Sequence, residues 1–219
     1  GKTNAILTRY ADDFCILCNG GRQEAEALRD ELKKFLWDEL HLELSEEKTH
    51  VTHIDEGINF LGYHIQRHTP KDNQPWVRIT PTRENVKRFT EKIKTLTRYN
   101  TTFMPVVEKL QVLNHLIKGW GNYYRHVNFA VDAAKLSWWI NRRVLIWLMC
   151  KHKGLGVRQL LAMYKVREKF SRYNRWNLGT KDGNGKMIYI SKLTDIRLGP
   201  YRPKTRPNPY LDEERTEEI

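Results

Sequence analysis

The sequence predicts an α+β region of β-hairpins plus an amphipathic helix, followed by an all-α helical bundle. The first part of the chain alternates short apolar runs with turn signals and holds one helical stripe. The second part carries apolar residues at steps of three and four, the spacing of packed helices. The charge also changes sign, from 8 Lys and Arg against 13 Asp and Glu in residues 1–70 to 29 against 8 in residues 71–210.

The first part begins with a hairpin over residues 4–18 that turns at Ala11–Asp13. Its second arm is a nearly continuous apolar run, which predicts a strand buried on both faces. Residues 22–40 carry leucines at helical spacing among charges, which predicts an amphipathic helix packed on the sheet. The remaining strands are expected at the alternating segment 41–45, in a second hairpin over 58–67, and at 76–80.

The second part reads as three helices, with a fourth to follow. The stripe of the second helix, which starts at Pro105, includes Trp120 and Tyr124, so these two aromatic residues are expected mainly in the core. Beyond residue 173 the chain is rich in Gly, Pro, Asn and Lys, which favours short strands or loops. The helices are expected at 82–99, 105–125, 135–153 and 156–170, with 202–210 extended and an acidic, disordered end.

Composition also limits the classes of function. The basic region is interleaved with Trp and Tyr, as expected of a surface that neutralises phosphates, although a merely solvated basic face is the alternative. The most apolar segment, residues 138–150, is interrupted by Arg142 and Arg143 and falls short of a membrane span. Without a secretion signal or a transmembrane segment, we expect a soluble protein of the bacterial cytoplasm or of an organelle.

The cysteines favour neither a disulfide framework nor a zinc site. Three cysteines, Cys15, Cys18 and Cys150, fit a reducing compartment. Cys15 and Cys18 have the spacing of a zinc knuckle, but on a strand their side chains point to opposite faces. We interpret both as small core residues.

Asp12 and Asp13 are the main candidates for chemistry. Neighbouring carboxylates serve one site only where the chain turns, and a hairpin tip supplies that turn. Their mutual repulsion is relieved by a cation, and oxygen-only ligands favour Mg²⁺. Such a site suits phosphoryl or nucleotidyl transfer with two metal ions. The alternative is a polar hairpin turn in which Asp is simply common.

Four segments together resemble a known family. Tyr10-Ala11-Asp12-Asp13 is similar to the Y-A-D-D motif of reverse transcriptases. Residues 44–49 (Leu-Ser-Glu-Glu-Lys-Thr), 60–63 (Phe-Leu-Gly-Tyr) and 117–125, with Gly-Trp-Gly-Asn-Tyr-Tyr, resemble motifs of the group II intron-encoded reverse transcriptase/maturases. The resemblance covers roughly residues 4–170 in the family's order. It implies a C-terminal palm fragment at 1–80, a thumb/maturase bundle at 81–170, and a basic, loop-rich extension at 171–219. DNA binding is one candidate role of this extension.

The resemblance also implies roles for single residues. Asp12 and Asp13 would hold catalytic Mg²⁺, and Lys48 would approach the triphosphate and serve as an acid for the leaving pyrophosphate, unless it is only a surface lysine. Tyr10, Phe60, Leu61 and Gly62 would contact primer or nucleotide. The expected RNA contacts are Lys118, Tyr123, Arg125, Arg142, Arg143, Lys151 and Arg158.

The family needs a further metal-binding Asp and the fingers, which we expect outside these residues. The expected partners are therefore structured intron RNA, an RNA template with a DNA primer, and an N-terminal fingers/palm portion or chain, but no membrane. The chain alone is expected to bind RNA without polymerising. The alternative is an RNA-binding maturase with no polymerase activity of its own. A retron-type or telomerase-like polymerase is disfavoured by the segment from Gly119 to Tyr124.

Overall fold

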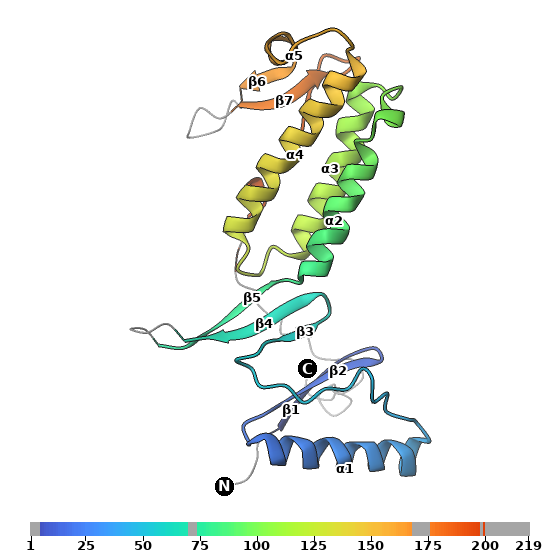
Figure 1. Ribbon diagram of the computed structural model, residues 1–219, viewed down its shortest axis with the longest axis vertical. Coiled ribbons are helices and arrows are strands. Elements are labelled where there is room, and N and C mark those ends of the chain that lie inside the picture. Colours follow the sequence, from blue (N-terminus) through green and yellow to red (C-terminus); the bar gives the residue numbers. More distant parts are fainter. Residues whose placement is uncertain (1–4, 70–73, 168–175, 198, 200–219) are drawn as a thin grey trace, which may run out of the picture.

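The computed structural model describes residues 5–69, 74–167, 176–197 and 199, which form a mixed α/β structure with antiparallel sheets. The segment 202–210 and the acidic end lie outside these residues. Along the long axis, α1 and the β1–β2 hairpin occupy one end, the sheet β3–β5 the middle and the helices the other end (Figure 1). The first elements are β1 (Ala5–Tyr10), β2 (Asp13–Cys18), α1 (Arg22–Leu40), β3 (Ile58–Phe60), β4 (Tyr63–His68) and β5 (Trp76–Pro81).

The β1–β2 hairpin forms as predicted, but its expected burial is wrong. The two strands pair antiparallel with Tyr10 opposite Asp13, which leaves Ala11 and Asp12 as the connecting residues. Every residue of β1 is exposed and Leu17 of β2 is 50% exposed. Helix α1 runs beside the hairpin in Figure 1, yet none of its residues is buried. Within the described residues, no second layer covers this end of the molecule. All three cysteines are free, as predicted.

The middle sheet contains three strands in the order β3-β4-β5, with Phe60 opposite Tyr63 and Ile65 opposite Ile79. The second hairpin and the strand after it are thus confirmed. The strand expected at 41–45 is wrong, because this segment pairs with no strand and leads into a turn in which the N–H of Thr49 donates to the carbonyl of Ser45 (3.0 Å). Alternating leucines alone do not make a strand without a partner.

Three long helices of the second part confirm the predicted bundle. Thr82 caps α2 through its side chain, which accepts a hydrogen bond from the N–H of Asn85, and Pro105 directly precedes α3 as expected. The helices are α2 (Arg83–Leu96), α3 (Val106–Tyr123) and α4 (Ala130–Lys151), with a single 3-10 turn, η1 (Tyr99–Thr101), between α2 and α3.

The predicted fourth helix is only partly correct. Helix α5 covers Val157–Tyr164, after which the chain becomes a strand, β6 (Lys165–Arg167). Lys165 pairs opposite Leu178 of β7 (Trp176–Lys181), so a tertiary pairing overrides the local helical pattern. The short strands expected beyond residue 173 are confirmed as β7 and β8 (Met187–Tyr189), followed by the 3-10 turn η2 (Leu193–Asp195).

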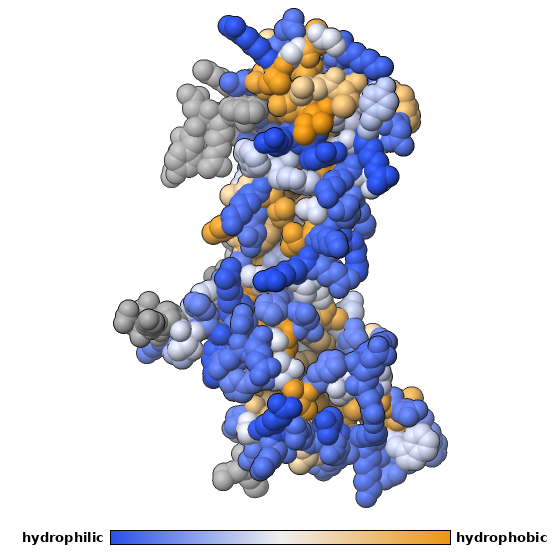
Figure 2. All heavy atoms as spheres, in the orientation of Figure 1, coloured by the Kyte–Doolittle hydropathy of each residue, from blue (hydrophilic) through white to orange (hydrophobic). Residues whose placement is uncertain are grey.

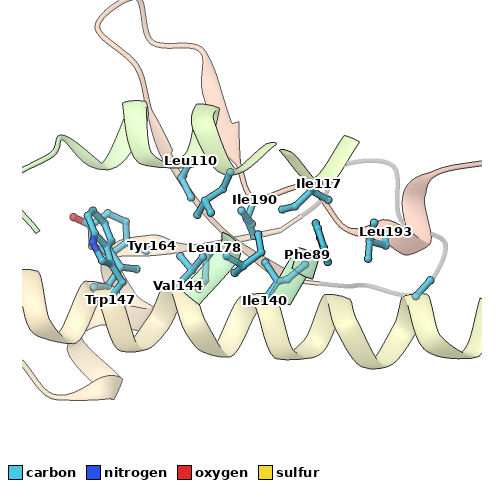
Figure 3. Close-up of a cluster of buried hydrophobic side chains, with 14 of the residues drawn as sticks. Phe89, Leu110, Ile117, Ile140, Val144, Trp147, Tyr164, Leu178, Ile190 and Leu193 are labelled. Atoms are coloured by element: carbon cyan, nitrogen blue, oxygen red, sulfur yellow. The ribbon is translucent and has the colours of Figure 1, made fainter. Parts of the chain in front are cut away.

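One hydrophobic core unites the helices with these C-terminal strands (Figure 3). Ile140, Val144 and Trp147 of α4 point into the cluster, where Leu178 and Ile190 meet them. Tyr124 is buried and Trp120 packs against the core partly buried, which confirms that both are core residues. Leu178, Ile190 and Leu193 are therefore an integral part of the bundle's interior. None of the helices described in the structure is both long and apolar enough to cross a membrane.

Two glycines of α3 provide a matched test of this packing. A Cβ at Gly121 would lie 2.0 Å from Cδ1 of Ile196 and 2.9 Å from Cδ2 of Leu193, whereas a Cβ at Gly119 meets nothing within 4 Å. We expect Gly119→Ala to raise the free energy of unfolding by up to about 1 kcal/mol, because Ala favours a helix. Gly121→Ala is expected to lower it by about 1 kcal/mol, because the packed side chains of Ile196 and Leu193 must shift. Chemical denaturation measures both, and equal effects would contradict the close approach.

Candidate metal and nucleic-acid site

Asp12 and Asp13 lie at the exposed tip of the β1–β2 hairpin. Asp12 is the second connecting residue, and Asp13 begins β2. Ala11 adopts a positive φ of 54°, as the first position of a type II′ turn requires, although Gly is the usual residue there. The Nε of Arg9 donates to the Ala11 carbonyl (2.7 Å) and supports this turn. Because a positive φ is costly for a residue with a Cβ, the tip holds a strained conformation, and such strain clusters at functional sites.

The chemistry of this tip fits a hard divalent cation only in part. Asp12 and Asp13 supply carboxylate oxygens, the ligands that Mg²⁺ prefers. The described residues contain no group of three or more His, Cys, Asp or Glu that is able to hold a metal ion. Lys48 lies exposed in the turn after Ser45, and no described contact joins it to either aspartate. Tyr10, at the end of β1, is 67% exposed beside this tip.

The second hairpin places the Phe60–Tyr63 motif against the bundle. Its connecting residues Leu61 and Gly62 have φ values of 50° and 79°, as in a type I′ turn. A Cβ on Gly62 would lie 2.3 Å from Nδ2 of Asn85, so only glycine fits this close approach. The sequence motif thus corresponds to a turn whose backbone is pressed onto α2.

The carbonyl of Gly62 accepts three hydrogen bonds. The donors are the backbone N–H of Thr82 (3.0 Å), the Tyr124 hydroxyl (3.2 Å) and Nδ2 of Asn85 (3.4 Å). Nδ2 of Asn85 also donates to the Tyr124 hydroxyl (2.9 Å), so the two side chains hold each other. Through this oxygen, the hairpin is bound to both α2 and the end of α3.

Tyr123 and Tyr63 complete this clamp, because the hydroxyl of each donates a hydrogen bond to a backbone carbonyl across the contact. The Tyr63 hydroxyl donates to the Tyr123 carbonyl (2.9 Å), and the Tyr123 hydroxyl donates to the Leu61 carbonyl (2.8 Å). Their rings stack with centroids 5.2 Å apart. Burial, together with the neighbouring Tyr123, raises the pKa of Tyr63 well above its usual range. We call the contacts of Tyr63, Asn85, Tyr123 and Tyr124 with residues 60–63 the hairpin clamp.

A cavity of ≈ 180 Å³ opens between α2 and α3 next to this clamp. Its aromatic lining comes from Phe89, Trp120, Tyr123 and Tyr124, and Arg88 and Lys92 of α2 add positive charge. Phe89 and Trp120 stack with centroids 4.5 Å apart. Hydrophilic residues cover most of the visible face of the helices around it (Figure 2).

Four of the expected RNA contacts lie exposed on the bundle: Lys118 of α3, Arg125, Arg142 of α4 and Arg158 of α5. The Arg142 guanidinium stacks 5.6 Å from the ring of Trp138, which is itself exposed. Tyr123 is half exposed, but its hydroxyl is used by the hairpin clamp. These cations are available to a partner on the surface.

Arg143 and Lys151 face a different environment. Arg143 donates to the carbonyl and to the hydroxyl of Thr97 (both 3.1 Å) at the end of α2. The ammonium of Lys151 donates to the carbonyls of Thr102 (2.8 Å) and Met104 (2.9 Å). Their placement between helices gives both side chains a structural role, which leaves fewer of their N–H groups for RNA.

The sequence patterns did not single out Asn85 or Lys109. Lys109 is 1% exposed and donates to the Leu96 carbonyl (2.6 Å), and burial lowers the pKa of its ammonium. In the sequence, the one sign of their contacts is that each polar residue stands next to an apolar residue of its helix. Lys109 precedes Leu110, and Asn85 precedes Val86. That signal is weak, because most such residues are only solvated.

Comparison with known proteins connects these two regions to one family. Residues 2–65 match the model described as reverse transcriptase (RNA-dependent DNA polymerase), and residues 86–176 match the group II intron, maturase-specific domain. The group II intron-encoded protein LtrA of Lactococcus lactis subsp. cremoris is 25% identical over 75% of this chain and 31% of its own length. Together these findings support a group II intron reverse transcriptase/maturase fragment.

Protein YkfC of Escherichia coli strain K12 is a second relative, 32% identical over 43% of this chain and 25% of its own length. The chain spans about a third of the length of LtrA. Along the chain, the reverse transcriptase match precedes the maturase match. The hairpin clamp joins them, because Tyr63 belongs to the first match and Asn85 to the short segment between them, while Tyr123 and Tyr124 belong to the second.

The clamp is tested by removing one hydroxyl. We expect Tyr124→Phe to lower the free energy of unfolding by about 1 kcal/mol and to speed amide hydrogen exchange in the 60–63 turn, because the Gly62 carbonyl loses a donor. Tyr189→Phe is the control, since that hydroxyl makes no hydrogen bond within the described residues. Unchanged exchange at 60–63 in the Tyr124 variant would contradict the clamp.

Proposed function

We propose that this chain is the C-terminal part of an RNA-directed DNA polymerase of the group II intron type, which also binds its intron RNA as a splicing maturase. The observation that carries the proposal is the order of the two matched regions together with the Asp12–Asp13 tip in the first of them. Residues 1–80 then form the end of the palm, 81–170 the thumb/maturase bundle, and 171–219 a basic extension. The burial of Leu178, Ile190 and Leu193 against the helices supports including the start of that extension in the same bundle.

In this proposal Asp12 and Asp13 hold Mg²⁺, which when bound supplies the charge that activates the primer hydroxyl and stabilises the leaving pyrophosphate. A further aspartate from the preceding part of the palm completes the ligand set. Lys48 donates a proton to the pyrophosphate as it leaves. Tyr10 and the 60–63 hairpin contact the nucleotide and the primer end, where the glycine turn allows a close backbone approach.

The exposed apolar surface of the first part supports a fingers/palm portion as partner. Large apolar side chains stand in water on β1, β2 and α1, an arrangement that an α+β layer avoids when it is complete. Such side chains are covered by another layer of secondary structure. The exposed residues are Ile6, Leu7, Tyr10, Leu17, Phe35, Trp37, Leu40 and Leu42.

For RNA, the proposal relies on the exposed cations of the bundle. Lys118, Arg125, Arg142 and Arg158 neutralise phosphates, and each neutralised phosphate releases counterions. The excess of 29 basic over 8 acidic residues in 71–210 supplies the long-range attraction. Structured intron RNA and the template–primer duplex are the expected polyanions.

A second function has one observation in its favour. Because residues 71–210 hold 29 basic against 8 acidic residues, the chain also fits an RNA-binding maturase without polymerase activity of its own. The two functions differ in what Asp12 does. Only the polymerase needs its carboxylate, whereas RNA binding and splicing support depend on the bundle.

The metal assignment is tested at Asp12. We expect Asp12→Asn to abolish Mg²⁺-dependent primer extension when these residues are assayed together with a fingers/palm portion that supplies the remaining aspartate, because a neutral amide holds the cation far less well. The readout is extension of a labelled primer on an RNA template. Asp38→Asn on α1 is the control and should extend normally. Retained extension in the Asp12 variant would remove the catalytic assignment, and splicing support unaffected by it would leave the maturase function standing.

RNA binding is tested by its salt dependence. The 219-residue chain should bind structured RNA with a log Kd that rises steeply with log salt, and Lys118→Gln with Arg125→Gln should reduce that slope by about 2. The control is Lys186→Gln, in the turn between β7 and β8, which should leave the slope unchanged. Titrations at several KCl concentrations provide the measurement, and a slope near zero would show that the basic surface does not grip RNA.

A further inference from the structure

The loop between α2 and α3 presents two aromatic side chains at the end of the bundle. Phe103 is 81% exposed and Tyr99 is 60% exposed, whereas Thr101, Thr102 and Met104 between and after them are partly buried. A large apolar ring that stays in water gains none of the free energy of burial. A loop that keeps two such rings exposed therefore suggests a partner that covers them.

This loop has a fixed conformation. The N–H groups of Thr101, Thr102 and Met104 donate to the carbonyls of Arg98, Tyr99 and Thr101 at 3.0 to 3.3 Å. The Thr101 hydroxyl also accepts from the indole Nε1 of the buried Trp147 (3.0 Å). The loop therefore cannot fold Phe103 inward without breaking several hydrogen bonds.

Three cations of α3 and α4 donate hydrogen bonds to backbone carbonyls of this loop and its flanks. Lys109, Arg143 and Lys151 donate to the carbonyls of Leu96, Thr97, Thr102 and Met104, as described above. A fourth, Lys153, lies with its ammonium 5.7 Å from the centroid of the Tyr99 ring. None of the four takes part in an ion pair among the described residues. Carbonyl dipoles leave their net charge in place, so four positive charges lie on the segment that carries the two exposed rings.

Exposed rings in a positive field match a ligand that carries both negative charge and flat apolar faces. Unpaired nucleotides have this combination, because their bases stack on aromatic side chains while their phosphates meet cations. Paired bases are already stacked and offer no free face to Phe103. Resting on the proposed RNA-binding function, we propose that Tyr99 and Phe103 form a stacking platform for unpaired bases of RNA, with Lys153 beside the phosphates.

In space, this platform is separate from the candidate metal site. The loop lies at the end of α2 that points away from the sheet β3–β5, whereas the Asp12–Asp13 tip lies beyond that sheet (Figure 1). At this end of the helices, apolar and hydrophilic surface lie side by side (Figure 2). An RNA held there is therefore gripped by the bundle independently of the polymerase site.

The test is a binding titration of the 219-residue chain with a labelled, unstructured RNA 12-mer and with a blunt RNA duplex of the same length. We expect Phe103→Ala to raise the Kd for the single strand about tenfold and to leave the Kd for the duplex unchanged. Phe103→Leu should behave like Phe103→Ala, because it keeps apolar bulk but loses the flat ring, and Phe103→Trp should bind at least as tightly as the native chain. Met163→Ala, at an exposed position of α5, is the control for loss of apolar surface.

The outcomes separate this inference from the proposed function. Failure of the native chain to bind either RNA would overturn both. Normal binding of the single strand by Phe103→Ala, or full rescue by Phe103→Leu, would overturn only the stacking platform. Binding to vesicles rich in anionic lipid that is lost in Phe103→Ala and kept in Phe103→Leu would assign the rings to a membrane surface instead. Because Phe103 is exposed, thermal unfolding should be unchanged in all Phe103 variants.

Discussion

The structure depends on the set of hydrogen bonds that converge on the carbonyl of Gly62. Three donors from two helices and from the residue before α2 fix the turn of the second hairpin. The edge strand β5 of the same sheet is also hydrogen-bonded to the bundle. The backbone N–H of Asn128 donates to the Ile79 carbonyl (2.8 Å), and the backbone N–H of Ile79 donates to Oδ1 of Asn128 (3.2 Å). Two attachments at the same end of the sheet, one at the β3–β4 turn and one on β5, define one orientation of sheet and helices. Consequently, any group placed by the 60–63 turn is positioned relative to α2 and α3 rather than to the β1–β2 hairpin.

The sequence could predict those elements whose signals are local. The three long helices, both hairpins and the β5 strand follow from periodicity, from Pro105 and from turn residues. Segments that depend on distant partners could not be predicted in this way. Residues 41–45 alternate like a strand but pair with none, and residues 165–167 leave the helical pattern because Leu178 offers a strand. The expected burial of β2 also failed, because burial depends on a covering layer that local pattern does not reveal.

Prediction of the candidate site shows the same division. The four-residue motifs located Asp12, Asp13 and Gly62 at turns, because turns have strong residue preferences. Contacts made by ordinary residue types could not be assigned from letters alone. Tyr124 was correctly expected in the core, yet its hydroxyl reaches Gly62, and Asn85 gave only a weak signal. Arg143 and Lys151 have the same composition signal as Arg142, but their donors point to carbonyls inside the molecule.

The cations beneath the α2–α3 loop have a consequence for how related sequences should be compared. Lys109, Arg143 and Lys151 act as internal braces, so their positive charge is needed even where no polyanion is bound. A homologue that replaced one of them with an apolar side chain would have to change the loop's carbonyls or its helix ends at the same time. Divergence at these positions therefore records the history of the loop's shape, whereas divergence at the exposed Lys118 or Arg125 would leave that shape unchanged.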